Sequence, residues 1–167
     1  MAGPNQLARE YDAMPERHEL YSKFGITAEA AQLFETELGT LLLCLQGRQE
    51  RWHEAPDGAA ARAFLDRIDR KTLGQLLKDV KLHISFEGGA EALFSSALNA
   101  RNQLSHGFFE RHNFRIQTSE GRAKMVADLE QLHTDLFTAW QVASAISDAM
   151  ANELSLNIPD RSRETKH

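Results

Sequence analysis

The chain has 167 residues, a length that suits one domain with a real hydrophobic core. Hydrophobic residues make up 42% and charged residues 26%, as in ordinary globular proteins. The net charge of −5 argues against a general nucleic-acid coat protein, which would need a basic surface. The longest strongly apolar run, Leu41 to Leu45, is far too short to span a bilayer, and the N-terminus lacks the pattern of a signal peptide.

Cysteine and metal-ligand motifs narrow the chemistry further. The one cysteine, Cys44, excludes an intramolecular disulfide, so we expect a cytoplasmic protein in which Cys44 is a buried small hydrophobe. The sequence has no CxxC, no HExxH and no acidic calcium loop, and it lacks a glycine-rich phosphate loop. We therefore expect no metal and no cofactor.

The charge is unevenly distributed along the chain. The segment from Arg101 to Lys124 holds five basic and two acidic residues, a net charge of +3, which leaves −8 for the remainder. A local basic patch on an acidic protein fits a confined anion site better than a long nucleic-acid track. An ordinary solvated surface is the alternative explanation.

In the N-terminal part, apolar spacing predicts two helices. The first covers Gln6 to Tyr21 with a bend near Pro15, and Phe24–Ile26 is a break. Thr27 is a plausible N-cap for a long helix that runs to about Trp52. The apolar stripe of this helix recurs at steps of three and four residues: Phe34, Leu38, Leu41, Leu42 and Leu45.

Two shorter helices follow a Pro-Asp-Gly turn. The first covers Ala59 to Asp69, with Phe64, Leu65 and Ile68 directed inward. Thr72 and Gln75 have the spacing of a capping box, in which each side chain satisfies the other's backbone N–H. The apolar residues of the helix that it starts are Leu76, Leu77, Val80 and Leu82.

The C-terminal part predicts two further helices separated by a connector. Gly88–Gly89 precedes a helix that ends at Gly107, and its apolar face is Leu93, Phe94, Ala97, Leu98 and Leu104. The connector runs from Phe108 to Gln117, with an ambiguous stretch at 114–116 where a short strand is possible. Thr118 or Ser119 starts the last helix, whose stripe is Met125, Leu129, Leu132, Leu136, Trp140, Ala143 and Ile146.

These elements predict an all-α protein, an up-and-down bundle of four main helices with additional short ones. We expect a disordered N-terminus over 1–5, a single helical domain over 6–156 and a flexible tail over 157–167. Leucine, methionine and aromatic stripes at this spacing are typical of a core rather than of a cofactor site.

The segment Arg101-Asn102-Gln103-Leu104-Ser105-His106 is the strongest functional signal. Arginine keeps its charge and binds phosphate oxygens as a fork, and histidine exchanges a proton near neutrality. Asn102 and His106 are four residues apart and share a helix face, so the amide can orient the imidazole while Arg101 reaches around from the side. Two structural explanations stay open: Arg101 pairs with Glu35 or Glu37, and His106 caps the helix.

The chain resembles the HEPN superfamily, which is marked by an Arg-x4-6-His motif. The resemblance is carried by the pattern Arg-Asn-x-Leu-x-His-Gly-Phe-Phe at the end of a late helix in an all-α chain of this length. The resemblance covers most of the chain. It implies a four-helix bundle that forms a homodimer with the two motifs facing each other. Many members are metal-independent endoribonucleases, often toxins or defence proteins, and others are silent interaction modules.

Residue by residue, the resemblance implies that Arg101 binds the scissile phosphate and that His106 is the acid/base, with Asn102 as its polar neighbour. We expect RNA contacts from the basic connector, at Arg111, His112 and Arg115. A metal held by His106 and His112 is the weaker idea. One departure is Phe108, where toxins paired with nucleotidyltransferase antitoxins often carry tyrosine, and this puts that regulatory system in doubt.

RNA chemistry is compatible with such a motif. Attack of the 2′-hydroxyl on the adjacent phosphate needs one group to take a proton and another, on the opposite side, to protonate the leaving oxygen. One histidine cannot do both, but a two-fold dimer supplies a second His106, and we expect the contact at this helix and at Phe108–Phe109. The alternatives are a non-catalytic module that binds a nucleotide or a protein such as an antitoxin, and a purely structural dimer.

Overall fold

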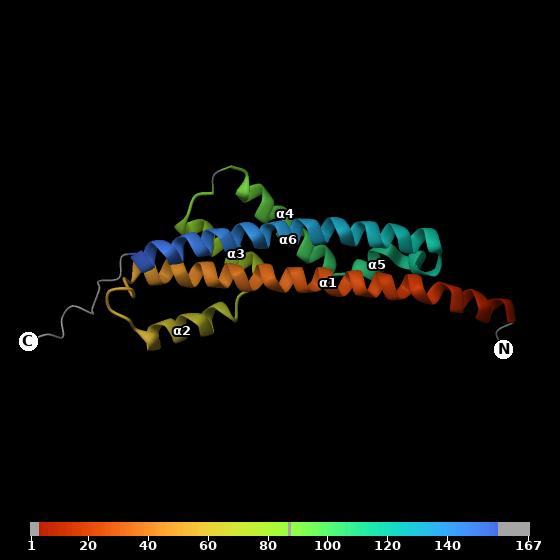
Figure 1. The fold of residues 1–167 in the computed structure, drawn as a ribbon, viewed down its shortest axis with the longest axis horizontal. Helices are drawn as coiled ribbons and strands as arrows, with labels where there is room; N and C mark the ends of the chain where they lie inside the picture. Colours follow the sequence, from red (N-terminus) through yellow and green to blue (C-terminus); the bar gives the residue numbers. More distant parts are fainter. Residues whose placement is uncertain (1–3, 87, 157–167) are drawn as a thin grey trace, which may run out of the picture. The chain divides into compact units, whose positions relative to one another are not determined.

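The computed structural model describes residues 4–86 and 88–156, and every regular element within them is helical (Figure 1). The prediction of an all-α protein is therefore confirmed for these residues. The 114–116 stretch, where a strand was possible, is part of a 3-10 helix. In chain order the elements are α1 (Pro4–Gln49), α2 (Gly58–Ile68), α3 (Leu73–His83), α4 (Ala90–Ser105), α5 (Phe108–His112), η1 (Asn113–Gln117) and α6 (Ser119–Leu156).

The chain divides into two compact units, each built from two separate stretches of sequence. Unit 1 comprises Met1–Leu33 and Ala92–Ala139, and unit 2 comprises Phe34–Glu91 and Trp140–His167. The single domain over 6–156 therefore stays a prediction. Residues 1–3 and the tail at 157–167 lie outside the described residues, whereas Pro4 and Asn5 are the first residues of α1.

The predicted break at Phe24–Ile26 is wrong, because α1 continues through it. Gly25 lies inside the helix, where a glycine costs only about 1 kcal/mol relative to alanine. Ending a helix there would leave up to four N–H and four C=O groups without helical partners. Thr27 is likewise no N-cap: its buried hydroxyl donates to the Lys23 carbonyl at 2.8 Å and lies 3.4 Å from the Leu129 carbonyl.

Side-chain caps begin both short helices of unit 2. In the predicted capping box, Thr72 N–H donates to Gln75 Oε1 at 2.8 Å and Gln75 N–H donates to Thr72 Oγ1 at 3.4 Å. Asp57 caps α2 by accepting from the Ala60 N–H at 2.9 Å. Leu82 is the exception to the predicted apolar face of α3, since it is 76% exposed.

The core of unit 2 is apolar and includes the whole stripe predicted from Phe34 to Leu45. The other predicted core residues Phe64, Leu65, Trp140 and Ile146 are half-buried. Cys44, which the sequence predicts to be buried, is only half-buried. Burial, with a smaller contribution from Glu37, raises the pKa of its thiol. The buried residues of this core are Phe34, Leu38, Leu41, Leu42, Leu45, Ile68, Leu73, Leu76, Leu77, Val80 and Ala143.

The core of unit 1 contains more small side chains, with five buried alanines against one in unit 2 among the described residues. It also includes a buried cation: Arg122 donates to Glu16 Oε2 from Nε at 2.8 Å and to the Ile116 carbonyl at 2.9 Å. The hydrogen bond from Arg122 is the main reason that the pKa of Glu16 is lowered. The apolar core residues are Leu20, Ala30, Ala31, Phe94, Ala97, Ala100, Leu104, Phe108, Met125, Leu129, Leu132, Leu136 and Ala139.

None of the described helices combines the length and the apolar character that crossing a lipid bilayer would require.

Candidate functional site

Arg101 and Asn102 lie in the last turns of α4, and His106 directly follows its last residue, Ser105; all three belong to unit 1. The opposite side of these turns is buried through Ala97, Ala100 and Leu104, which fixes the helix against the core. Asn102 and His106 are exposed, and Arg101 is half-buried. The helix thus holds three polar groups at one end while its apolar side anchors it.

The Asn102 side chain contacts Arg101 rather than the imidazole. Arg101 Nη1 donates to Asn102 Oδ1 at 3.5 Å, and the link between Asn102 and His106 is the backbone bond from His106 N–H to the Asn102 carbonyl at 2.9 Å. Orientation of the His106 ring by the amide therefore stays a prediction. The same holds for the pairing of Arg101 with Glu35 or Glu37.

Gly107 ends α4 as predicted and turns the chain into α5. Its φ of 99° and ψ of 31° are left-handed values that favour glycine. The turn brings Arg111 back toward α4, where its Nη1 donates to Gln103 Oε1 at 3.1 Å. The guanidinium also lies 5.8 Å from the centroid of the Phe108 ring. An exposed arginine is thereby held beside the motif.

His112 is placed differently from the other predicted RNA contacts, because its side chain is only 2% exposed. Arg115 Nη1 lies 3.2 Å from Nδ1, and Asp128 Oδ2 lies 3.0 Å from Nε2 without the alignment of a hydrogen bond. Since an arginine can only donate, Nδ1 is the acceptor, and the proton of the neutral ring is on Nε2, facing the carboxylate. Arg111 and Arg115 are exposed; the His112 ring is covered.

Burial is the main cause that lowers the pKa of His112. The Asp128 carboxylate opposes this by raising the pKa, and the charges of Arg111 and Arg115 lower it further. The ring is therefore neutral at pH 7. Asp128 was missed by sequence reasoning, because it lies 16 residues further along the chain and no motif connects it with the histidine.

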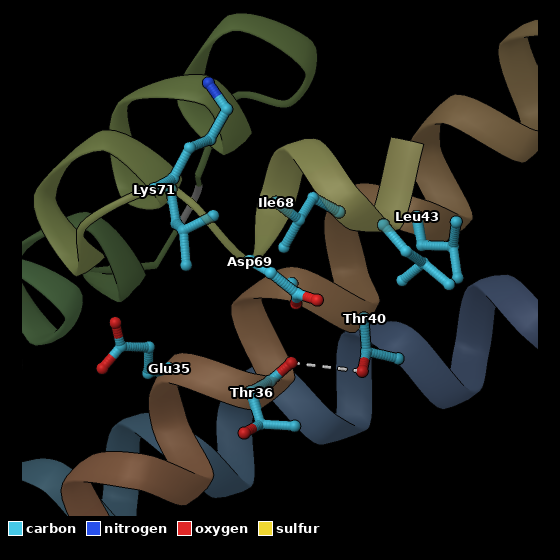
Figure 2. A pocket seen from close by; sticks show the side chains of 10 residues that line it. Glu35, Thr36, Thr40, Leu43, Ile68, Asp69 and Lys71 are labelled. Atoms are coloured by element: carbon cyan, nitrogen blue, oxygen red, sulfur yellow. Dashed lines mark hydrogen bonds between the residues drawn. The ribbon is translucent and has the colours of Figure 1, made fainter. Parts of the chain in front are cut away.

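Unit 2 has a pocket of its own, between α1 and the segment that joins α2 to α3 (Figure 2). Glu35 and Asp69 are the acidic residues of its lining, and the Thr40 hydroxyl donates to the Thr36 carbonyl at 3.2 Å. The Lys71 side chain points away from it, and its ammonium pairs with Asp79 at 2.7 Å. None of the side chains that line this pocket has a buried polar atom without a hydrogen-bond partner in the described residues, so the pocket indicates no particular ligand.

Within the described residues, no group of three or more His, Cys, Asp or Glu side chains is arranged to hold a metal ion. No family model matches the chain, and neither a curated protein nor a solved structure shows a significant match to it. Function must therefore be argued from the chemistry of the site.

Proposed function

We propose that the protein is an HEPN-like, metal-independent endoribonuclease that acts as a homodimer. The observation that carries the proposal is the polar end of α4, where Arg101 and Asn102 lie on a helix anchored by its buried side and an exposed His106 directly follows it. A cation and an imidazole on a fixed helix suit a phosphodiester substrate. A cytoplasmic location and a role as a toxin or defence protein belong to the same proposal.

In this mechanism the RNA supplies its own nucleophile. One His106 takes the proton of the 2′-hydroxyl, whose oxygen then forms a bond to phosphorus, while the bond to the 5′-oxygen breaks. The His106 of a second copy protonates that leaving oxygen, giving a 2′,3′-cyclic phosphate and a free 5′-hydroxyl. Arg101 stabilises the charge that develops on the non-bridging oxygens.

The surroundings of the motif support an anionic substrate. Arg111, held by Gln103, and Arg115 are exposed cations on the same unit. Glu110 is the one acidic residue between Arg101 and Arg115 in the sequence. Local positive charge on an acidic protein attracts phosphate at a confined place.

A second candidate is a non-catalytic module of the same family type that binds a nucleotide or a protein partner. The net charge of −5 favours it, because most RNA-binding surfaces need a broader excess of positive charge. An antitoxin-like protein would be one such partner.

Cleavage of single-stranded RNA in the presence of EDTA tests the proposal. Arg101→Ala and His106→Ala should each abolish cleavage, Asn102→Ala should weaken it less, and DNA should survive because it lacks the 2′-hydroxyl. His18→Ala is the matched control, since it removes an exposed histidine from the same unit outside the motif. Far-UV circular dichroism should show the same helix content in all variants.

The dimer is tested separately by light scattering, which should give about twice the 18.8 kDa of one chain. RNA left intact across a broad panel of sequences would remove the nuclease and leave the binding module. Cleavage that needs magnesium, or that persists in His106→Ala, would contradict the mechanism.

A further inference from the structure

We infer that Tyr21 and Phe109 form a stacking surface for a base of single-stranded RNA beside the His106 motif. The inference deepens the proposed function, since it names how the substrate is held. It starts from a feature that the motif does not include: a continuous group of rings, the aromatic cluster, made of Tyr21, Phe24, Phe108, Phe109 and His112.

The aromatic cluster has a buried side and an exposed side. Phe108 and His112 form the buried side, with ring centroids 4.6 Å apart, and Phe108 is 1% exposed. Tyr21 and Phe109 form the exposed side, at 53% and 37% exposure, with centroids 6.1 Å apart and planes tilted by 44°. Phe109 packs against the buried Phe108 ring, with centroids 5.4 Å apart, and Tyr21 packs against Phe109, so the exposed side is connected to the core through Phe109.

Phe109 is tied closely to the motif. It is three residues after His106, and the α5 helix that carries it is held to α4 by the bond from Arg111 to Gln103, the residue next to Asn102. Arg111 also lies over the Phe108 ring, so a cation borders the apolar surface. Exposed aromatic rings beside arginines are the combination with which proteins hold single-stranded nucleic acid, the rings for bases and the cations for phosphates.

The area of the exposed rings favours an RNA base over a second copy of the chain as the ligand of this surface. The exposed parts of the two rings offer roughly 200 Å² of apolar surface, taking about 150–250 Å² for a whole aromatic side chain. A stable protein interface needs about 800 Å² on each partner. One or two bases cover the exposed rings, whereas a dimer contact needs several times their area. This assigns the exposed face of Phe109 to RNA, where the sequence had suggested a dimer contact at Phe108–Phe109.

The experiment measures binding without cleavage. The probe is a fluorescent ten-nucleotide 2′-O-methyl oligouridine, which lacks the attacking hydroxyl, compared with the same oligomer carrying abasic sites at its centre. Wild-type protein should bind the abasic oligomer more weakly. Phe109→Leu and Tyr21→Leu keep apolar volume but remove the ring, and each should weaken binding of the intact oligomer by about fivefold or more. Their affinity for the abasic oligomer should change much less.

Two controls are available in the chain. Tyr21→Phe keeps the ring and should bind like wild type. Phe114→Leu removes a ring that is 70% exposed on η1 and outside the aromatic cluster, and it should leave affinity unchanged. Far-UV circular dichroism and thermal melting check that Phe109→Leu is folded. Tyr21→Leu is the second test, because it replaces a side chain that is 53% exposed and is therefore less important for folding.

Three results would overturn the inference: no binding of the oligomer by wild-type protein, equal affinity of the leucine variants and wild type, or a lowered mass of these variants in light scattering, which would make the surface a protein contact. The proposed function fails independently. Cleavage of unmodified RNA with no effect of the ring substitutions would leave the nuclease and remove the stacking surface. Binding of the oligomer that depends on the rings, without any cleavage of RNA, would leave the stacking surface and remove the nuclease.

Discussion

Among the described residues, unit 1 and unit 2 bury different kinds of polar group. Thr27, His112 and Arg122 are buried in unit 1, each bonded to another part of the chain or facing a charged partner. In unit 2, Ser147 is buried, and so is Nδ1 of the half-buried His53. Neither the Ser147 hydroxyl nor this ring nitrogen has a hydrogen-bond partner in the described residues. Unit 2 is thus stabilised mainly by apolar packing, whereas unit 1 also contains buried charged and hydrogen-bonded contacts.

The difference shows where the fold needs specific geometry. Apolar packing tolerates small shifts, while a buried arginine or histidine is stabilising only when its partners are correctly placed. The unit with such networks is also the one that carries Arg101 and His106. A helix end that must hold polar groups in fixed positions gains from this kind of surrounding structure.

The largest expected effect tests the apolar side of the comparison. Leu41→Ala in unit 2 removes a side chain with no exposed surface and leaves a cavity, so it should lower the free energy of unfolding by about 2–5 kcal/mol. Urea unfolding followed by circular dichroism measures this change. A loss below about 0.5 kcal/mol would mean that Leu41 is not closely packed, and that unit 2 does not depend on its apolar core.

A smaller effect is expected where unit 1 requires close backbone approach. A Cβ on Gly121 would lie 2.7 Å from Arg115 C and Cα and would collide with the carbonyl oxygen of that residue. Gly121→Ala should therefore destabilise the protein by about 1–3 kcal/mol in urea unfolding.

Gly25→Ala is the matched control, because it lies in the helix α1 with nothing within 4 Å of its added Cβ. It should stabilise the protein by about 1 kcal/mol through helix propensity. Equal effects of the two substitutions would contradict the close contact between η1 and the start of α6.

The smallest effect concerns pH and unit 1. Because the pKa of His112 is lowered in the folded protein, its neutral form is favoured there. As pH falls below about 6.5, the unfolded chain takes up a proton at this position that the folded protein does not. The free energy of unfolding therefore decreases with pH until the pKa of His112 in the folded protein is reached. His112→Gln keeps an acceptor for Arg115 and removes the titration.

Urea unfolding at pH 7.5 and pH 5.5 should therefore show a smaller loss of stability for His112→Gln than for wild type. His18→Gln, which removes an exposed histidine of the same unit, controls for the loss of one histidine. An identical loss in wild type and His112→Gln would show that this ring is not what makes unit 1 sensitive to acid.

Sequence reasoning worked where the signal was local. The capping box of Thr72 and Gln75 and the helix end at Gly107 depend on residues within one helical turn, and both are confirmed. The sequence also predicts the motif at the end of a helix. The apolar spacing of α4 determines which side of this helix is buried, and Asn102 is on the other side.

It failed where distant contacts decide the outcome. The sequence predicts a break at Phe24–Ile26, but α1 continues through it, because the backbone hydrogen bonds lost at two helix ends would outweigh the cost of one glycine. Thr27 contacts the Leu129 carbonyl of α6 instead of capping a helix. The burial of His112 against Asp128 and the arrival of Tyr21 beside Phe109 depend on helices meeting in space. Spacing along one helix carries no information about them.

The turn at Gly107 has an evolutionary consequence. Its left-handed backbone makes any other side chain strained, and its neighbour Phe108 is buried, so the fold itself restricts substitution at both positions. His106, one residue earlier, is exposed and carries no such structural constraint. In a lineage that no longer needed the chemistry, the histidine would drift while the glycine stayed. Retention of both side by side in diverged descendants would therefore record selection for activity, separately from selection for folding.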